Sequence, residues 1–199
     1  MSLIEIIEPR DEFSRQYRIG QFLTLVVAIL FFLYGINARN NTLNALVQYT
    51  DIEAGISLSY PAEWLIDFDG DYIIRARDMQ RMGYKTTIQI TLLPIGPDIT
   101  ERNVLDTLNN TRARSVIGYD ILSITPVTLP DETQATAMEY TFVDSGTNPF
   151  LASIPVVVRG RDILLIRGGQ AIVVTFRTDA LQFADEVGTL ESVLSSLEY

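Results

Sequence analysis

The longest apolar stretch of the chain lies at residues 19–36, where IGQFLTLVVAILFFLYGI contains no charged side chain. A helix rises about 1.5 Å per residue, so this run extends roughly 27 Å, close to the ~30 Å hydrocarbon core of a bilayer. A secretory signal has a shorter apolar centre and a small-residue cleavage site. Here Ala-x-Ala is missing, and Phe31, Phe32 and Tyr34 are typical of an interfacial aromatic belt. We expect an uncleaved transmembrane helix; a retained signal peptide is the alternative.

Charges beside this run predict its orientation. Arg10, Arg15 and Arg18 precede it, whereas only Arg39 follows closely. Because Lys and Arg are favoured on the cytoplasmic side, we expect residues 1–18 to be cytoplasmic and the rest of the chain to lie on the extracytoplasmic side.

Within the run, small side chains recur at intervals that place them along one face of a helix. These are Gly20, Thr24, Ala28 and Gly35. Small residues let two helix backbones approach closely in a lipid environment, so this face is a candidate packing interface with another transmembrane helix. Chance remains the alternative for so short a pattern.

Beyond the run, most of the chain alternates between apolar and polar positions. Residues 37–54 are polar, with apolar positions at helical spacing, and we expect a short helical or loose tether there. From residue 55 onward the period of two predicts strands, and Gly168-Gly169 predicts a tight hairpin. The strand-like stretches are 55–60, WLIDF, DYIIRA, 86–93, 119–129, 133–143 and 154–167, the last bent or broken at Arg159-Gly160, and then QAIVVTFRT.

Two further segments have helical periodicity. Residues 99–118 place Val104, Leu105 and Leu108 on one face, with Thr100 as a plausible N-cap. A terminal helix starts near Asp179 and carries an apolar stripe. The order of strands, helix, strands and helix predicts an α+β domain over residues 55–199, in which helices cover a mainly antiparallel sheet.

The amino-acid composition excludes several classes of function. The 199 residues carry a net charge of −10, and an acidic surface disfavours nucleic acid as a partner. The sequence has no histidine and no cysteine, which excludes Ser-His-Asp and Cys-His catalysis. We therefore expect a protein that is not an enzyme, with no catalytic, metal-binding or cofactor-binding residues.

GISLSYPAEW at residues 55–64 resembles the opening of the PsbP-like domain family, whose fold also occurs in envelope proteins of the DcrB and LpqN type. VVVRGRDILLIRGGQAIVVTF is similar to that family's closing hairpin, and FADEVGTLESVLSSLEY to its terminal helix. The resemblance implies an α/β/α sandwich with a central antiparallel sheet. Members of this fold often serve as accessory parts of photosynthetic and other bioenergetic complexes, and others bind small apolar ligands or act in the envelope.

Two polar stretches could carry a site. DFDGD at residues 67–71 places three carboxylates at alternate positions, which suits either a calcium loop or, more simply, a hairpin turn. A second stretch gathers four cations, which could contact an acidic partner or anionic lipid headgroups, or else form a solvated face paired with local aspartates. They are Arg75, Arg77, Arg81 and Lys85.

The sequence thus favours a membrane-anchored, non-catalytic accessory subunit of a photosynthetic or respiratory electron-transport complex. The partners of such a subunit would be other protein subunits and the membrane, which it would cross once. As the resemblance implies, this would be the plasma membrane or a photosynthetic membrane. The alternative is an anchored envelope protein that binds an apolar small molecule or lipid between sheet and helices.

Overall fold

A computed structural model describes residues 15–43, 45–81, 83–146 and 154–199. The chain divides into two units, at residues 1–45 and 46–199. Residues 1–14 of the predicted cytoplasmic segment 1–18, Arg10 among them, lie outside the described residues.

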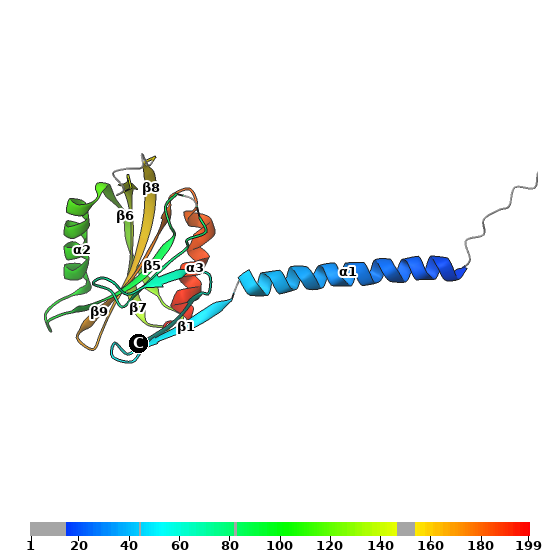
Figure 1. Ribbon diagram of the computed structural model, residues 1–199. Helices are drawn as coiled ribbons and strands as arrows, with labels where there is room; N and C mark the ends of the chain where they lie inside the picture. The colour runs from blue at the N-terminus through cyan, green and yellow to red at the C-terminus, as the bar shows by residue number, and fades with distance from the viewer. Residues whose placement is uncertain (1–14, 44, 82, 147–153) are drawn as a thin grey trace, which may run out of the picture. The chain divides into compact units, whose positions relative to one another are not determined.

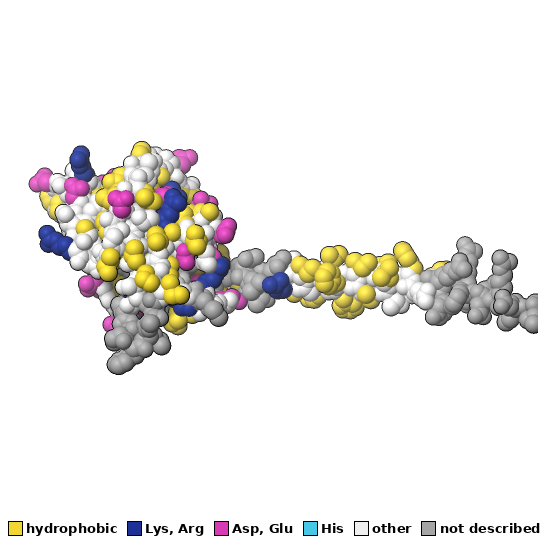
Figure 2. Space-filling model, turned by 90° about the horizontal axis from the view of Figure 1, so that it is seen from above, with side chains coloured by type: hydrophobic (Ala, Val, Ile, Leu, Met, Phe, Trp, Pro, Cys, Tyr) yellow, Lys and Arg dark blue, Asp and Glu magenta, His cyan; other side chains and the backbone are white. Residues whose placement is uncertain are grey.

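The first unit contains helix α1, Arg15–Leu43. Within it, Ile19–Arg39 is long and apolar enough to cross a membrane by length and composition, as an anchor or a signal sequence would be. Its large side chains are exposed, for example Phe31 at 73% and Tyr34 at 71%. Figure 2 shows hydrophobic side chains along most of the visible side of this helix.

The second unit is built on a seven-stranded sheet in which every neighbouring pair is antiparallel. The strand order is β3-β4-β5-β9-β8-β7-β6. A separate two-stranded sheet joins β1 to β2. The bounds are β1 Leu46–Asp51, β2 Ile56–Pro61, β3 Leu65–Asp67, β4 Ile74–Arg77, β5 Thr87–Pro94, β6 Ile117–Thr128, β7 Gln134–Asp144, β8 Val156–Arg167 and β9 Gln170–Asp179.

Helices cover the two faces of this sheet separately. Helix α2, Glu101–Ser115, and helix α3, Phe183–Ser195, lie on opposite sides (Figure 1). Because side chains alternate along each strand, two apolar layers form. Ile172, Val174 and Phe176 of β9 pack in the layer beneath α3, whereas Ala171 and Val173 pack in the layer that contains Val104 and Leu105 of α2. The predicted α+β sandwich with an antiparallel sheet is confirmed.

The structure differs from three local expectations. A helical or loose tether was expected over residues 37–54, but α1 ends at Leu43 and residues 46–51 form β1. These residues form a strand because their backbone pairs with β2 along its whole length, and Tyr49 stacks on Phe68. Strand β8 runs unbroken through Gly160, whose missing side chain leaves room for the Tyr140 ring. Helix α3 begins at Phe183 rather than near Asp179, because residues 179–182 form a turn.

Candidate functional site: an arginine-lined hollow on the sheet

Polar side chains form a line across the α2-side face of the sheet. Strand register places five of them opposite one another on five successive strands, from β3 to β8. We call this line the polar row, and its members are Asp67, Arg75, Gln89, Thr175 and Asp162. The β8 end lies beneath α2, whereas Asp67, Arg75 and Gln89 stay partly exposed.

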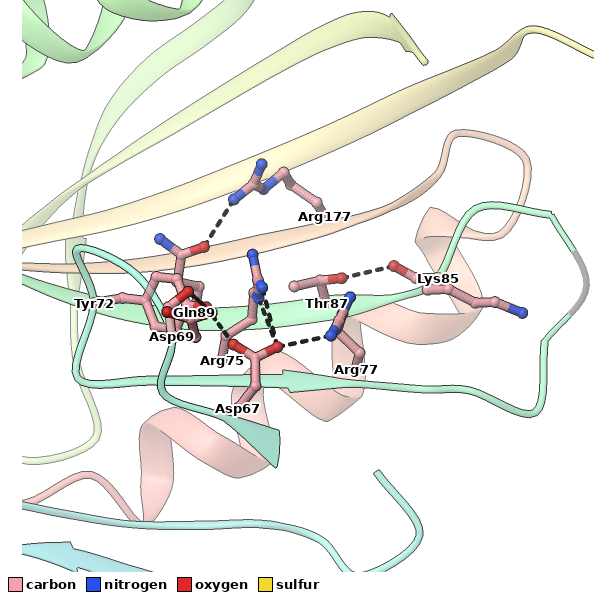
Figure 3. Close-up of polar contacts among 9 residues, drawn as sticks. All are labelled: Asp67, Asp69, Tyr72, Arg75, Arg77, Lys85, Thr87, Gln89 and Arg177. Carbon is pink, nitrogen blue, oxygen red and sulfur yellow. Dashed lines mark hydrogen bonds and ion pairs between the residues drawn. The ribbon is translucent and has the colours of Figure 1, made fainter. Parts of the chain in front are cut away.

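Asp67 organises the exposed end of the polar row (Figure 3). The Arg75 guanidinium donates to its Oδ2 atom through Nε at 3.1 Å and Nη2 at 3.0 Å, and Arg77 donates through Nη2 at 2.7 Å. The Tyr72 hydroxyl donates to Oδ1. Hydrogen bonding from Tyr72, followed by Arg75 and Arg77, holds the pKa of Asp67 below its usual value. Asp67 is therefore ionised at neutral pH and occupied by three donors.

Arg177 of β9 adds a third guanidinium on this face. It lies opposite Thr87 of β5, and Thr87 lies opposite Arg77 on the other side. Its Nη2 donates to Oε1 of Gln89 at 3.1 Å. The Nε atoms of Arg77 and Arg177 are buried and have no hydrogen-bond partner. The inner ends of both guanidinium groups are therefore enclosed by protein.

These side chains surround an open hollow with a volume of about 380 Å³. We call it the arginine hollow, and its described lining consists of Arg75, Arg77, Gly83, Tyr84, Lys85, Thr87, Asp144, Gly146 and Arg177. Tyr84 packs edge-on against Phe142, and burial raises the pKa of its hydroxyl. That hydroxyl stays protonated at neutral pH and can act as a hydrogen-bond donor.

The four cations predicted from sequence do not form one cluster. Arg75 and Arg77 meet on Asp67, as the alternative of pairing with local aspartates predicts. Arg81 instead pairs with Asp78 and reaches Glu186 of α3, on the other side of the sheet. Lys85 lines the hollow, but its ammonium points away from the arginines in Figure 3 and donates to the Arg81 carbonyl. Its reach into the hollow is therefore smaller than that of the three arginines.

Arg177 was missed by sequence reasoning because it is far from the other cations in the chain. A signal was present, since TFRT breaks the apolar run of β9 with a charge at a position that shares a face with Val173. To place Arg177 beside the other arginines, one would have had to know that β9 pairs with β5 as well as with β8.

The covered end of the polar row carries a second arginine–aspartate pair, also missed. Arg112 of α2 donates to both carboxylate oxygens of Asp162, which is 0% exposed. Its guanidinium lies 4.4 Å from the Tyr140 ring centroid. Burial alone would lower the pKa of Arg112, but Asp162 reverses this and raises it, while burial and Asp162 raise the pKa of Tyr140. Arg112 therefore stays charged and the Tyr140 hydroxyl stays protonated at neutral pH.

Asp67 is the last residue of β3, and the rest of DFDGD lies in the connection to the antiparallel strand β4, as the hairpin alternative predicts. Among the residues that the structure describes, no group of three or more acidic side chains could hold a metal ion. Gly20, Thr24, Ala28 and Gly35 all fall in α1, and the Thr24 hydroxyl donates to the Gly20 carbonyl at 2.9 Å. Their role in helix packing stays a prediction.

No family model and no curated protein matches the chain significantly. Several solved structures match the chain in fold. The solution structure of cyanobacterial PsbP (CyanoP) from Synechocystis matches with a TM-score of 0.55 and 15% identity, over 77% of this chain and 92% of that one. LpqN of Mycobacterium tuberculosis, involved in cell envelope biogenesis, matches with a TM-score of 0.50 and 13% identity, over 77% and 89%. At these identities the likeness concerns the fold, which is PsbP-like.

Proposed function

We propose that the protein is a non-catalytic accessory subunit of a membrane-bound complex, anchored by α1. The observation that carries this proposal is the exposed apolar surface of Ile19–Arg39, joined to a folded domain with a PsbP-like fold. Exposed aliphatic and aromatic side chains along the helix are costly in water and favourable in lipid. With Arg15 and Arg18 before the span and Arg39 after it, the positive-inside tendency favours a domain on the extracytoplasmic side.

The edge strand β6 supports contact with another protein. Among the described strands it pairs only with β7, and three of its large aliphatic side chains are at least 48% exposed: Ile117, Leu122 and Ile124. An open edge offers unpaired backbone groups to a strand of a partner, and the aliphatic side chains add apolar contact. We propose that β6 is the surface that meets a neighbouring subunit.

The likeness to CyanoP supports a bioenergetic complex, photosynthetic or respiratory, as the assembly to which the protein belongs. Because fold alone does not fix function, copurification of the protein with its complex is the direct test. The full chain should be purified from its native membranes in a mild detergent. Comigration with cofactor-bearing subunits is the expected result, and a monodisperse monomer would contradict it.

Introducing two arginines on β6 tests whether this strand contacts the neighbouring subunit. We expect Ile117→Arg combined with Leu122→Arg to release the protein from its complex, because the charges oppose burial at an apolar interface. The matched control is Ile52→Arg with Leu181→Arg, at two positions that are each 92% exposed. If both double variants stopped comigrating with the complex, or if neither did, β6 would be excluded as the contact surface.

The small face of α1 provides a second possible contact. A side chain added at Gly20 or Gly35 would meet nothing within 4 Å in the chain itself, so close packing there would need another helix. We expect Thr24→Leu with Ala28→Leu to keep membrane insertion and release the protein from its complex. If the double variant still copurifies at wild-type stoichiometry, α1 is only a tether.

An anchored envelope protein that binds an apolar small molecule or lipid is the second candidate, favoured by the likeness to LpqN. A hollow of about 350 Å³ beside α2 is lined in part by Leu105 and Ile124. Lipid in the mass spectrum of a purified monomer would support this function over the first.

A further inference from the structure

We propose that the arginine hollow is a binding site for a phosphate-type dianion, such as inorganic phosphate or the phosphomonoester of a headgroup. The inference concerns a site on the domain and does not depend on membership of a complex. Copurification therefore tests the proposed function separately.

The charge balance of the hollow is the first argument. In a chain with a net charge of −10, four cations line this one depression: Arg75, Arg77, Lys85 and Arg177. The described lining contains one carboxylate, Asp144, and Asp67 lies alongside. The three arginines exceed these two carboxylates by one positive charge, and Lys85 adds a further cation at the edge of the hollow. This excess favours an anion such as a phosphate monoester, which carries a charge of about −1.5 to −2 at neutral pH.

The hydrogen-bonding capacity of the guanidinium groups is the second argument. Each guanidinium has five N–H donors. Arg77 donates to Asp67 through one nitrogen, and Arg177 donates to Gln89 through one nitrogen. Arg177 also hydrogen-bonds with the Tyr84 side chain, which lines the same hollow. The terminal N–H groups beyond these contacts are the donors from which a tetrahedral oxyanion can accept several hydrogen bonds at once. Arginine suits this role because its planar fork binds phosphate oxygens two at a time.

Pre-organisation is the third argument. Asp67 fixes the heads of Arg75 and Arg77, while Gln89 fixes that of Arg177. The buried Nε atoms of Arg77 and Arg177 show that the protein encloses the base of both groups. Binding then costs little side-chain entropy, because the cations are already held in place before the anion arrives.

Asp67 also competes with the anion for the same donors, which gives the proposal a variant that gains affinity. Replacing Asp67 with Asn keeps the side-chain size and an oxygen that can accept from Arg75 and Arg77, but it removes the negative charge that opposes a bound anion. A structural role of this cluster alone would predict no such gain.

The test is calorimetric titration of the full chain in neutral detergent, without phosphate in the buffer. Inorganic phosphate is one ligand, dihexanoyl phosphatidic acid is the second, and dihexanoyl phosphatidylcholine is the lipid control. Arg77→Gln removes a charge-assisted hydrogen bond to the anion and should weaken binding by roughly 10-fold or more. Asp67→Asn should tighten binding by roughly 3-fold or more, because a negative charge beside the anion is removed.

Arg114→Gln is the matched control, since Arg114 is an exposed arginine on α2 away from the hollow and the variant loses the same charge. Its affinity should stay within about 2-fold of wild type, because a distant charge acts only through the screened field. Arg77-dependent binding of inorganic phosphate identifies free phosphate as the source, and such binding of the phosphatidic acid alone identifies a headgroup. Binding of neither at about 10 mM, or equal losses in Arg77→Gln and Arg114→Gln, would overturn the proposal.

Discussion

Two arginine–aspartate clusters lie at opposite ends of the polar row, on the same face of one sheet. At the β8 end, α2 covers Arg112 and Asp162, and the carboxylate is 0% exposed. At the β3 end, Asp67 with Arg75 and Arg77 stays open, with side chains 21%, 31% and 34% exposed. The residue types are the same, so the difference between the two clusters lies in what covers them.

Solvent exposure determines whether each cluster can exchange its ion-pair partners. Asp162 is enclosed by Arg112, Tyr140 and the layer beneath α2, so its charge must be neutralised within the protein. Solvent screens the open cluster, so its pairs stabilise the fold weakly and its cations can exchange partners. The covered cluster therefore supports the fold, and the open cluster is where a ligand can bind.

The largest expected effect comes from removing the covered carboxylate. Asp162→Ala leaves the Arg112 guanidinium under α2 without its partner, which should lower the free energy of unfolding by about 3–5 kcal/mol. Asp67→Ala removes the equivalent carboxylate from the open cluster and should cost less than about 1 kcal/mol. Chemical denaturation of both variants measures the difference, and equal losses would contradict the comparison.

Gly160→Ala should have the next largest effect. An added Cβ would lie 2.3 Å from Cζ of Tyr140, the ring that stacks on Arg112 in the covered cluster. We expect overpacking to cost about 1–3 kcal/mol. The same substitution at Gly188 of α3 meets nothing within 4 Å and should stabilise the protein by roughly 0.5–1 kcal/mol. Thermal melting of the two variants should therefore shift in opposite directions.

The contribution of the open cluster should depend on pH. The pKa of Asp67 in the folded protein is lower than in the unfolded chain, so folding favours the ionised form. The stability difference between wild type and Asp67→Ala should be fully present above about pH 4, the ordinary range for an aspartate, and should fade as pH falls through the folded pKa. A difference that grows on acidification would reverse the sign and exclude the cluster as its source.

Arg81→Gln should have the smallest effect. Its guanidinium is 45% exposed and pairs toward α3, so we expect a loss of about 0.5 kcal/mol or less and no change in phosphate affinity. Arg77→Gln, two strand positions after Arg75, should weaken phosphate binding. If Arg81→Gln weakened it equally, the four cations would act as one cluster after all.

The sequence predicted those features that depend on neighbouring residues. DYIIRA was predicted as a strand, and β4 buries Ile74 and Ala76 while Arg75 lies on the opposite face. The hairpin at DFDGD brought Asp67 within reach of that face. Thr100 was predicted as the helix cap, and it pairs with Asn103 at the start of α2.

Features that depend on distant strand pairing could not be predicted in this way. Arg177 enters the hollow because β9 lies between β5 and β8, an order that local periodicity does not contain. Arg112 and Asp162 are 50 positions apart and meet only once α2 lies across β8. Gly160 suggested a break in its strand, but the cross-strand Tyr140 ring explains the glycine without one.

The separation of the two clusters can be measured directly by nuclear magnetic resonance of arginine Nε–Hε groups in the full chain, held in neutral detergent. Signals assigned through single variants would be followed during titration with inorganic phosphate. The account predicts that the signals of Arg75, Arg77 and Arg177 move with phosphate while that of Arg112 stays in place. A shift of Arg112 equal to the others, or no shift of the three hollow arginines, would contradict it.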